Sequence, residues 1–102
     1  MQEINTDPLG FEWDDDKNAE NIRKHGVSFG EAQTAFTDES APYYFDPDHS
    51  HEEDRYLLIG MSSSQGILIV SHCYRDGGLK ISIISARRAN ENEKKEYRRY
   101  HA

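Results

Sequence analysis

Three apolar segments in the second half of the chain are joined by links that leave room only for tight turns. The segments are RYLLIGMS at residues 55–62, ILIVSHCYR at 67–75 and KISIISA at 80–86. Links such as SSQG and DGG connect neighbouring antiparallel strands, whereas parallel strands need a crossover of a dozen or more residues. The spacing therefore predicts a three-stranded antiparallel meander on which the other elements pack.

The residues before this meander predict a short strand followed by a helix. In FEWD, residues 11–14, aromatic and acidic side chains alternate as they do along a strand. The next helix is expected over about 16–25, with Ala19 and Ile22 on its apolar stripe.

A sharp corner then separates two helices. His25 and Gly26 end the first helix, because glycine readily adopts the left-handed conformation found just beyond a helix end. Ser28 and Glu31 have the spacing of a capping box and begin a second helix over about 29–37.

The remaining elements complete an α+β layout. Residues 38–54 hold seven acidic residues, no basic residue and two prolines, which predicts an extended loop. Asn90 begins a C-terminal helix, with Glu93 three residues later. We expect an α+β fold in which the antiparallel meander and the short N-terminal strand are packed with two N-terminal helices and one C-terminal helix. Residues 1–10 are expected to be an N-terminal extension and 11–102 a single domain.

The expected cellular localisation is inferred from features that the sequence lacks. The lone Cys73 excludes an intramolecular disulfide and suits a reducing compartment. No apolar run reaches the ~18 residues of a membrane span, and the acidic start MQEINTDPLG is unlike a signal peptide. We expect a cytoplasmic protein without membrane contact.

The net charge of −7 is unevenly distributed along the chain. Residues 1–54 hold 15 acidic and 3 basic side chains, whereas residues 55–102 hold 4 acidic and 9 basic ones, a net charge of +5. The asymmetry indicates one anionic and one cationic region, although ordinary surface scatter is the alternative. Overall acidity therefore does not exclude a nucleic-acid ligand, which binds through local Lys and Arg side chains.

The acidic segment DPDHSHEED, residues 46–54, allows three interpretations. His49 beside carboxylates could transfer protons. His49 and His51 could bind a divalent metal ion, although no cysteine or HExxH spacing completes the ligand set. The segment could also be a solvated surface loop.

Basic residues recur at the ends of the predicted strands and beyond them. Strand-end guanidinium groups are well placed to bind phosphate, although they could equally form salt bridges with the acids of the first half. This series consists of Arg55, Arg75, Lys80, Arg87 and Arg88. A further basic pair, Lys24 and His25, could act in the site or simply favour the negative end of a helix dipole.

Three stretches of the chain carry a family resemblance. They are FEWDDDKNAENIRKHGVSFGEAQTAFTD, DPDHSHEEDRYLLIG and ISARRANENEKKEY, and the first contains the pattern W-D-x-x-K-x-x-x-N-x-x-K-H-G-V-x-F-x-E-A. Over about residues 11–97 the chain resembles the BrnT family of toxins from bacterial type II toxin–antitoxin modules. The resemblance implies a fold like that of RelE-type ribonucleases and toxin activity against RNA. It also implies neutralisation by a BrnA-like ribbon-helix-helix antitoxin, with two toxins and two antitoxins per complex and operator DNA bound only through the antitoxin.

The implied reaction is RNA cleavage without a metal or other cofactor, in which the ribose 2′-hydroxyl attacks the adjacent phosphorus. His49, with Glu53 as its orienting partner, is the expected proton-transfer group. Arg75 and Arg87 are expected to stabilise the phosphate. The residues expected to bind RNA are Lys24, His25, Arg55, Lys80 and Arg88, and Lys17 is a further matching position. One departure is Ser82, which stands where the family commonly has a basic residue; it favours the alternative of a weakly active or inactive module that serves mainly as the antitoxin's partner in operon repression.

Overall fold

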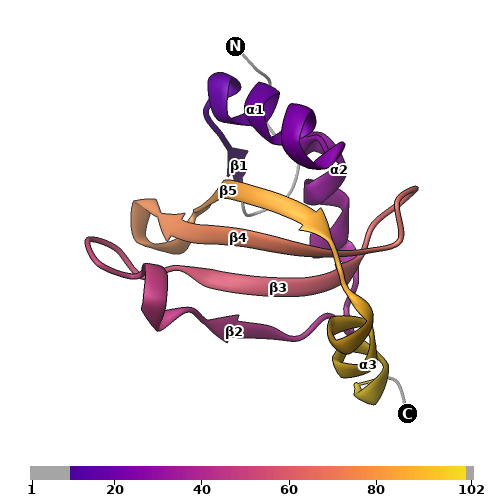
Figure 1. Cartoon of the computed structure of the whole chain (residues 1–102). Coiled ribbons are helices and arrows are strands. Elements are labelled where there is room, and N and C mark those ends of the chain that lie inside the picture. Colours follow the sequence, from indigo (N-terminus) through magenta and orange to yellow (C-terminus); the bar gives the residue numbers. More distant parts are fainter. Residues whose placement is uncertain (1–9, 101–102) are drawn as a thin grey trace.

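The computed structural model describes residues 10–100, which form one five-stranded sheet and three helices (Figure 1). The strands lie in the order β1-β5-β4-β3-β2. In chain order the elements are β1 (Gly10–Glu12), α1 (Asp15–His25), α2 (Phe29–Thr34), β2 (Tyr43–Phe45), β3 (Tyr56–Met61), β4 (Ile67–Arg75), β5 (Lys80–Arg88) and α3 (Glu91–Arg99). Of the expected N-terminal extension, residues 1–9 lie outside the described residues, and Gly10 begins β1.

The predicted α+β fold and antiparallel meander are confirmed, since β3, β4 and β5 pair in antiparallel order. Two features of the sheet were not predicted. β1 pairs with β5 in parallel, which makes the sheet mixed. β2 forms at the opposite edge, inside the segment expected to be a loop. It has only three residues between Pro42 and Pro47, so its sequence lacks the length that marks a strand.

Helix α1 begins and ends as expected, but it packs differently from the prediction. The expected apolar stripe was wrong, because Ala19 is exposed and Ile22 is 45% exposed. The buried residue of α1 is Asn21, whose Nδ2 donates to the carbonyl oxygens of Val27 and Ala86, each at 2.8 Å. Its Oδ1 also accepts from the Ala86 N–H at 3.1 Å. One amide therefore fastens α1 to both the corner and β5, and all its buried polar atoms are satisfied.

The corner between the helices follows from backbone chemistry. Gly26 adopts φ 70°, the left-handed conformation that ends α1. Ser28 Oγ accepts from the Glu31 N–H at 3.0 Å and begins α2. The Glu31 carboxylate turns instead to the β3–β4 link, where the N–H groups of Ser64 and Gln65 donate to it at 2.7 and 3.1 Å. A short 3-10 turn, Ala35–Thr37, continues α2 to the predicted end of the helix.

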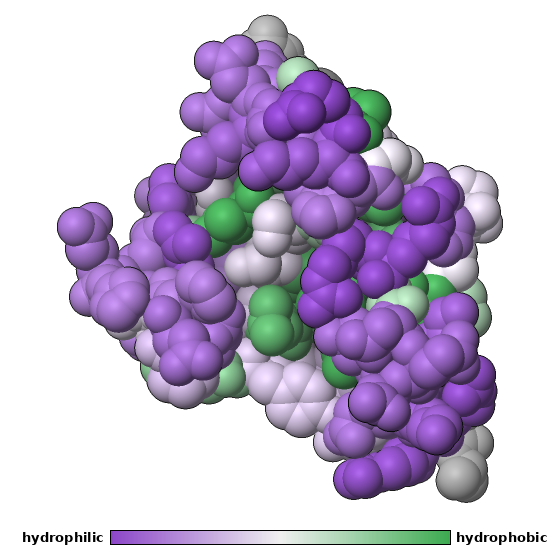
Figure 2. All heavy atoms as spheres, viewed as in Figure 1, coloured by the Kyte–Doolittle hydropathy of each residue, from purple (hydrophilic) through white to green (hydrophobic). Residues whose placement is uncertain are grey.

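The two faces of the sheet differ in how they are covered. One face packs on α2 and the corner in the main core, which contains Val27, Phe29, Ala32, Ala35, Leu58, Leu68, Val70, Ile83 and Ala86. On the other face α3 packs through Tyr97 against Ile59 and Ile69, and the rest stays open. The view in Figure 2 shows pale and apolar residues in a hollow bordered by hydrophilic ones. Within residues 10–100, no helix is long and apolar enough to cross a membrane.

Candidate functional site

Two neighbouring cavities lie along the open face of the sheet. The first, of about 380 Å³, has an apolar floor formed by Leu57, Ile69 and Ile84. Its polar walls are formed by His25, Asp46, His49, Arg55, Ser71, Ser85 and Arg87. A polar rim above an apolar floor is a usual arrangement for a ligand site.

His49 lies at the end of a short 3-10 turn, Pro47–His49, on the wall of the first cavity. Its Nδ1 is 2.8 Å from Oδ2 of Asp46. The predicted orienting partner was wrong, since Glu53 pairs with Arg75 instead. A carboxylate can only accept, so the hydrogen of a neutral imidazole stands on Nδ1 and Nε2 is left for proton transfer.

The turn that carries His49 is tied to the sheet through one serine. Ser50 Oγ donates to the Asp46 carbonyl at 2.6 Å and accepts from the Arg55 N–H at 2.9 Å. The Asp46 N–H in turn donates to the Arg55 carbonyl at 2.8 Å. The spacing of Asp46 and His49 in DPDH was the sequence signal for this pair, and the sequence prediction missed it.

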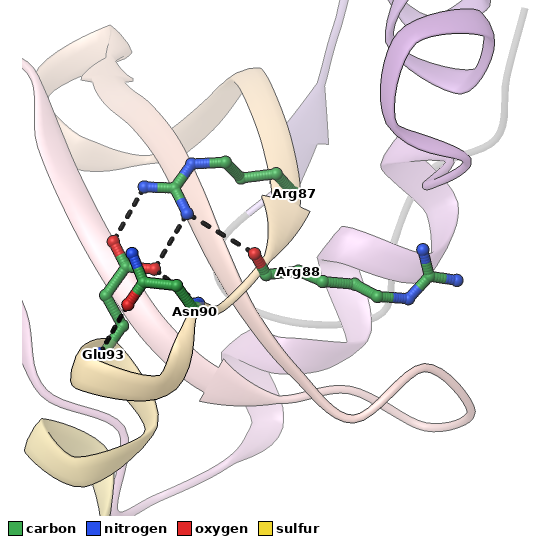
Figure 3. Close-up of polar contacts among 4 residues, drawn as sticks. All are labelled: Arg87, Arg88, Asn90 and Glu93. Atoms are coloured by element: carbon green, nitrogen blue, oxygen red, sulfur yellow. Dashed lines mark hydrogen bonds and ion pairs between the residues drawn. The ribbon is translucent and has the colours of Figure 1, made fainter.

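Arg87 lines the first cavity near the end of β5 and is held by α3. Its Nη1 and Nη2 each lie 2.8 Å from one carboxylate oxygen of Glu93, in a bidentate pair (Figure 3). Glu93 also accepts from the Asn90 N–H at 2.9 Å, which completes the capping box of α3. The hydrogen bond from Arg87 is the main reason that the pKa of Glu93 is lowered, and the pKa of Arg87 is raised by the same pair.

Arg55 borders both cavities, and it differs from Arg75 and Arg87 in its hydrogen bonding. Its Nε is buried and has no hydrogen-bond partner among residues 10–100. Arg87 and Arg75, by contrast, are each paired with a carboxylate. A buried N–H without a partner costs free energy, so an acceptor brought into either cavity would be favoured at this position.

The second cavity, of about 390 Å³, is lined by Glu53 and Arg75, which the sequence analysis had grouped with His49 and Arg87. Arg75 Nη2 lies 3.0 Å from Glu53 Oε2, and its Nη1 lies 3.7 Å from Glu12 Oε2. The hydrogen bond from Arg75 is the largest cause of a lowered pKa at Glu53. The expectation of one phosphate-binding cluster of Arg75 and Arg87 was wrong, because they line different cavities.

The remaining predicted residues divide between the cavities and other surfaces. His25, the last residue of α1, lines the first cavity, and Lys17 lines the second. Lys24 lies outside both cavities and pairs with Glu20 at 3.6 Å. Arg88 extends away from Arg87 in Figure 3, and its Nη1 donates to the His25 carbonyl at 3.5 Å.

Lys80 and His51 line neither cavity. The backbone of Lys80 stands opposite that of Arg75 in the β4–β5 ladder. No group of three or more His, Cys, Asp or Glu side chains within residues 10–100 is arranged to hold a metal ion.

The structure is a small α+β domain whose first cavity, on the open face of the sheet, is lined by two histidines and two arginines. A family model, described as the ribonuclease toxin BrnT of a type II toxin–antitoxin system, matches residues 13–93. The chain belongs to this BrnT family of ribonuclease toxins. The crystal structure of the Brucella abortus ribonuclease toxin BrnT is similar, with a TM-score of 0.59 and 28% identity over 79% of this chain and 96% of that chain. No curated protein matches the sequence.

Proposed function

We propose that this BrnT-family chain cleaves RNA in the first cavity without a metal ion. One observation carries the proposal: His25, His49, Arg55 and Arg87 line a single cavity on the open face of the sheet. Two of them are already oriented by carboxylates, His49 by Asp46 and Arg87 by Glu93. Such preorganisation is what transition-state stabilisation needs.

The reaction follows from the chemistry of these groups. His49 Nε2 takes the proton of a ribose 2′-hydroxyl, whose oxygen attacks the adjacent phosphorus to form a 2′,3′-cyclic phosphate. His25, as the second histidine of the cavity, protonates the departing 5′-oxygen. Arg87 and Arg55 donate hydrogen bonds to the phosphoryl oxygens, where negative charge increases in the transition state.

Ser82 does not weaken this proposal. It is buried and lines the second cavity, whereas His49 and Arg87 line the first. The absence of a basic side chain at Ser82 therefore concerns the second cavity, and the inactive module remains the alternative that the activity assay below tests.

The proposed partner is a ribbon-helix-helix antitoxin of the BrnA kind, in a complex of two toxins and two antitoxins that contacts operator DNA only through the antitoxin. The excess of basic residues in residues 55–102 supports a partner segment with acidic groups, because complementary charge favours association. A cytoplasmic location fits an RNA substrate. Light scattering on the co-expressed pair tests the stoichiometry, and a strict one-to-one mass would exclude it.

The test of activity is the purified chain incubated with RNA in EDTA, together with induction of the chain alone in a bacterium. We expect cleavage to products ending in cyclic phosphate, and arrested growth. Cleavage abolished by EDTA would favour a metal-dependent reaction instead. Normal growth at good expression, with no cleavage in vitro, would favour the module that only binds its antitoxin.

A further inference from the structure

The second cavity is chemically unlike the first. It is lined by three carboxylates, from Glu12, Asp14 and Glu53, and by three cations, Lys17, Arg55 and Arg75. The half-buried indole of Trp13 also lines it. The cavity therefore combines an aromatic surface with equal numbers of positive and negative side chains.

This balance argues against a phosphate as the occupant. Arg75 already lies between two carboxylates, at 3.0 Å from Glu53 and 3.7 Å from Glu12. The hydrogen bond from Arg75 lowers the pKa of Glu53, which is thus ionised at neutral pH and repels an anion. The Asp14 carboxylate is occupied in capping α1. A neutral, flat ligand with both donors and acceptors fits these walls better.

An ion pair of this kind presents acceptors and donors side by side. Among the four RNA bases, guanine alone has two adjacent donors, N1–H and the N2 amino group, for a carboxylate that can only accept. Beside those donors, guanine O6 and N7 accept the paired donors of an arginine. Adenine and cytosine would place an acceptor nitrogen against the carboxylate, and uracil offers a single donor there.

We infer that the second cavity is a guanine subsite in which Glu53 accepts from N1–H and N2–H, Arg75 donates to O6 and N7, and Trp13 forms an apolar wall against the base. The inference rests on the proposed function, since it makes the base part of the RNA that the first cavity cleaves. The two cavities share Arg55 and Ile84 on one sheet face. A guanine in the second cavity thus belongs to a nucleotide next to the cleaved linkage, with Arg55 between them.

Trp13 gives a direct measurement, because it is the single tryptophan of the chain. Guanosine, which carries no phosphate, should change its fluorescence at concentrations at least about tenfold lower than adenosine, cytidine or uridine, since one bidentate contact discriminates bases by that order. Glu53→Gln replaces one acceptor oxygen by a donor and should remove this preference. Glu91→Gln, which changes a carboxylate that lines neither cavity, is the matched control and should keep it. Equal responses to the four nucleosides, or a guanosine response unchanged in Glu53→Gln, would overturn the subsite.

Cleavage provides the second measurement. Four matched oligonucleotides that differ only in the base beside the cut linkage should show kcat/KM at least about tenfold higher for guanine in the wild type, with the ratio falling toward one in Glu53→Gln. If Glu53→Gln fails to fold, as circular dichroism would reveal, Glu12→Gln tests the second carboxylate. Cleavage without base preference refutes the subsite but leaves the proposed function standing. A guanosine-specific Trp13 response in a chain that cuts no RNA refutes the proposed function and leaves the subsite.

Discussion

Substituting Glu93 tests how Arg87 is oriented in the wall of the first cavity. The Glu93 carboxylate accepts hydrogen bonds from two partners. It pairs with Arg87 through two 2.8 Å contacts and accepts from the Asn90 N–H at 2.9 Å. Glu93→Gln keeps an acceptor oxygen for the capping box, which tolerates glutamine, and removes the charge that Arg87 requires. The substitution therefore separates the ion pair from the cap.

The expected loss of unfolding free energy is about 1 kcal/mol. Hydrogen bonds to charged groups contribute about 1.5–3 kcal/mol, but surface ion pairs contribute only about 0.2–1 kcal/mol. The Glu93 and Arg87 side chains are 25% and 43% exposed, so their pair lies between these cases and solvent screening reduces it. In a domain of this size, a loss of about 1 kcal/mol lowers Tm by roughly 4–8 °C.

The pH dependence supplies an independent check on the same pair. The pKa of Glu93 is lowered in the folded chain from its ordinary value of 4.5. A carboxyl group whose pKa is lower in the folded chain stabilises the fold at every pH above its unfolded-state pKa. This stabilisation is lost as the pH falls through the folded-state pKa. Urea titrations at pH 7 should show the full difference between wild type and Glu93→Gln, and the difference should shrink steadily below about pH 4.5.

A double-mutant cycle decides whether Arg87 is the partner responsible. In an Arg87→Ala background, Glu93→Gln should cost almost nothing, giving a coupling of about 1 kcal/mol. Equal losses in both backgrounds, or a difference independent of pH, would refute the reasoning. Glu93→Gln should also lower kcat/KM for RNA, because Arg87 loses its fixed orientation.

Four other substitutions test the cavity and its support. His49→Ala should lower kcat by about 10²–10⁴ through lost proton transfer, measured on purified protein with EDTA present. Arg87→Ala should lower kcat by about 10²–10³ through loss of a transition-state donor, and a normal rate would exclude that role. His25→Ala should melt normally and cut poorly; a lowered Tm with unchanged cleavage per folded molecule would instead assign His25 to helix termination alone. Asn21→Ala should lower the unfolding free energy by about 2–3 kcal/mol in urea, since it leaves buried groups of Ala86 unpaired.

The parts of the fold that could be predicted from the sequence are those encoded by neighbouring residues. Short links forced the meander, Gly26 ended α1, and Asn90 with Glu93 capped α3. The parallel pairing of β1 with β5 was not predictable, because strand direction across about 70 residues depends on tertiary packing. The packing of α1 was misjudged for a related reason: a polar amide, Asn21, makes the buried contact where an apolar stripe was expected.

The candidate site was predicted as a set of residue types and not as an arrangement. His49 and Arg87 do share a cavity with His25 and Arg55. Arg75 lies in another, however, because it stands at the opposite end of the β4–β5 ladder from Arg87. The predicted meander already carried this signal, because Arg75 flanks the turn between the two strands while Arg87 stands beyond the far end of the second strand, and the prediction did not use it.

The corner at Lys24 and His25 is positioned by the spacing of residues along α1. Asn21 and His25 are four residues apart, so they lie one turn apart on the same side of α1. Asn21 is bound to Ala86 of β5, and Ala86 lines the first cavity together with His25. Asn21 thus attaches the last turns of α1 to the strand that borders this cavity, while Lys24 pairs with Glu20 away from it. Because Gly26 ends α1 directly after His25, the chain turns toward α2 there, and of the basic pair only His25 lines the first cavity.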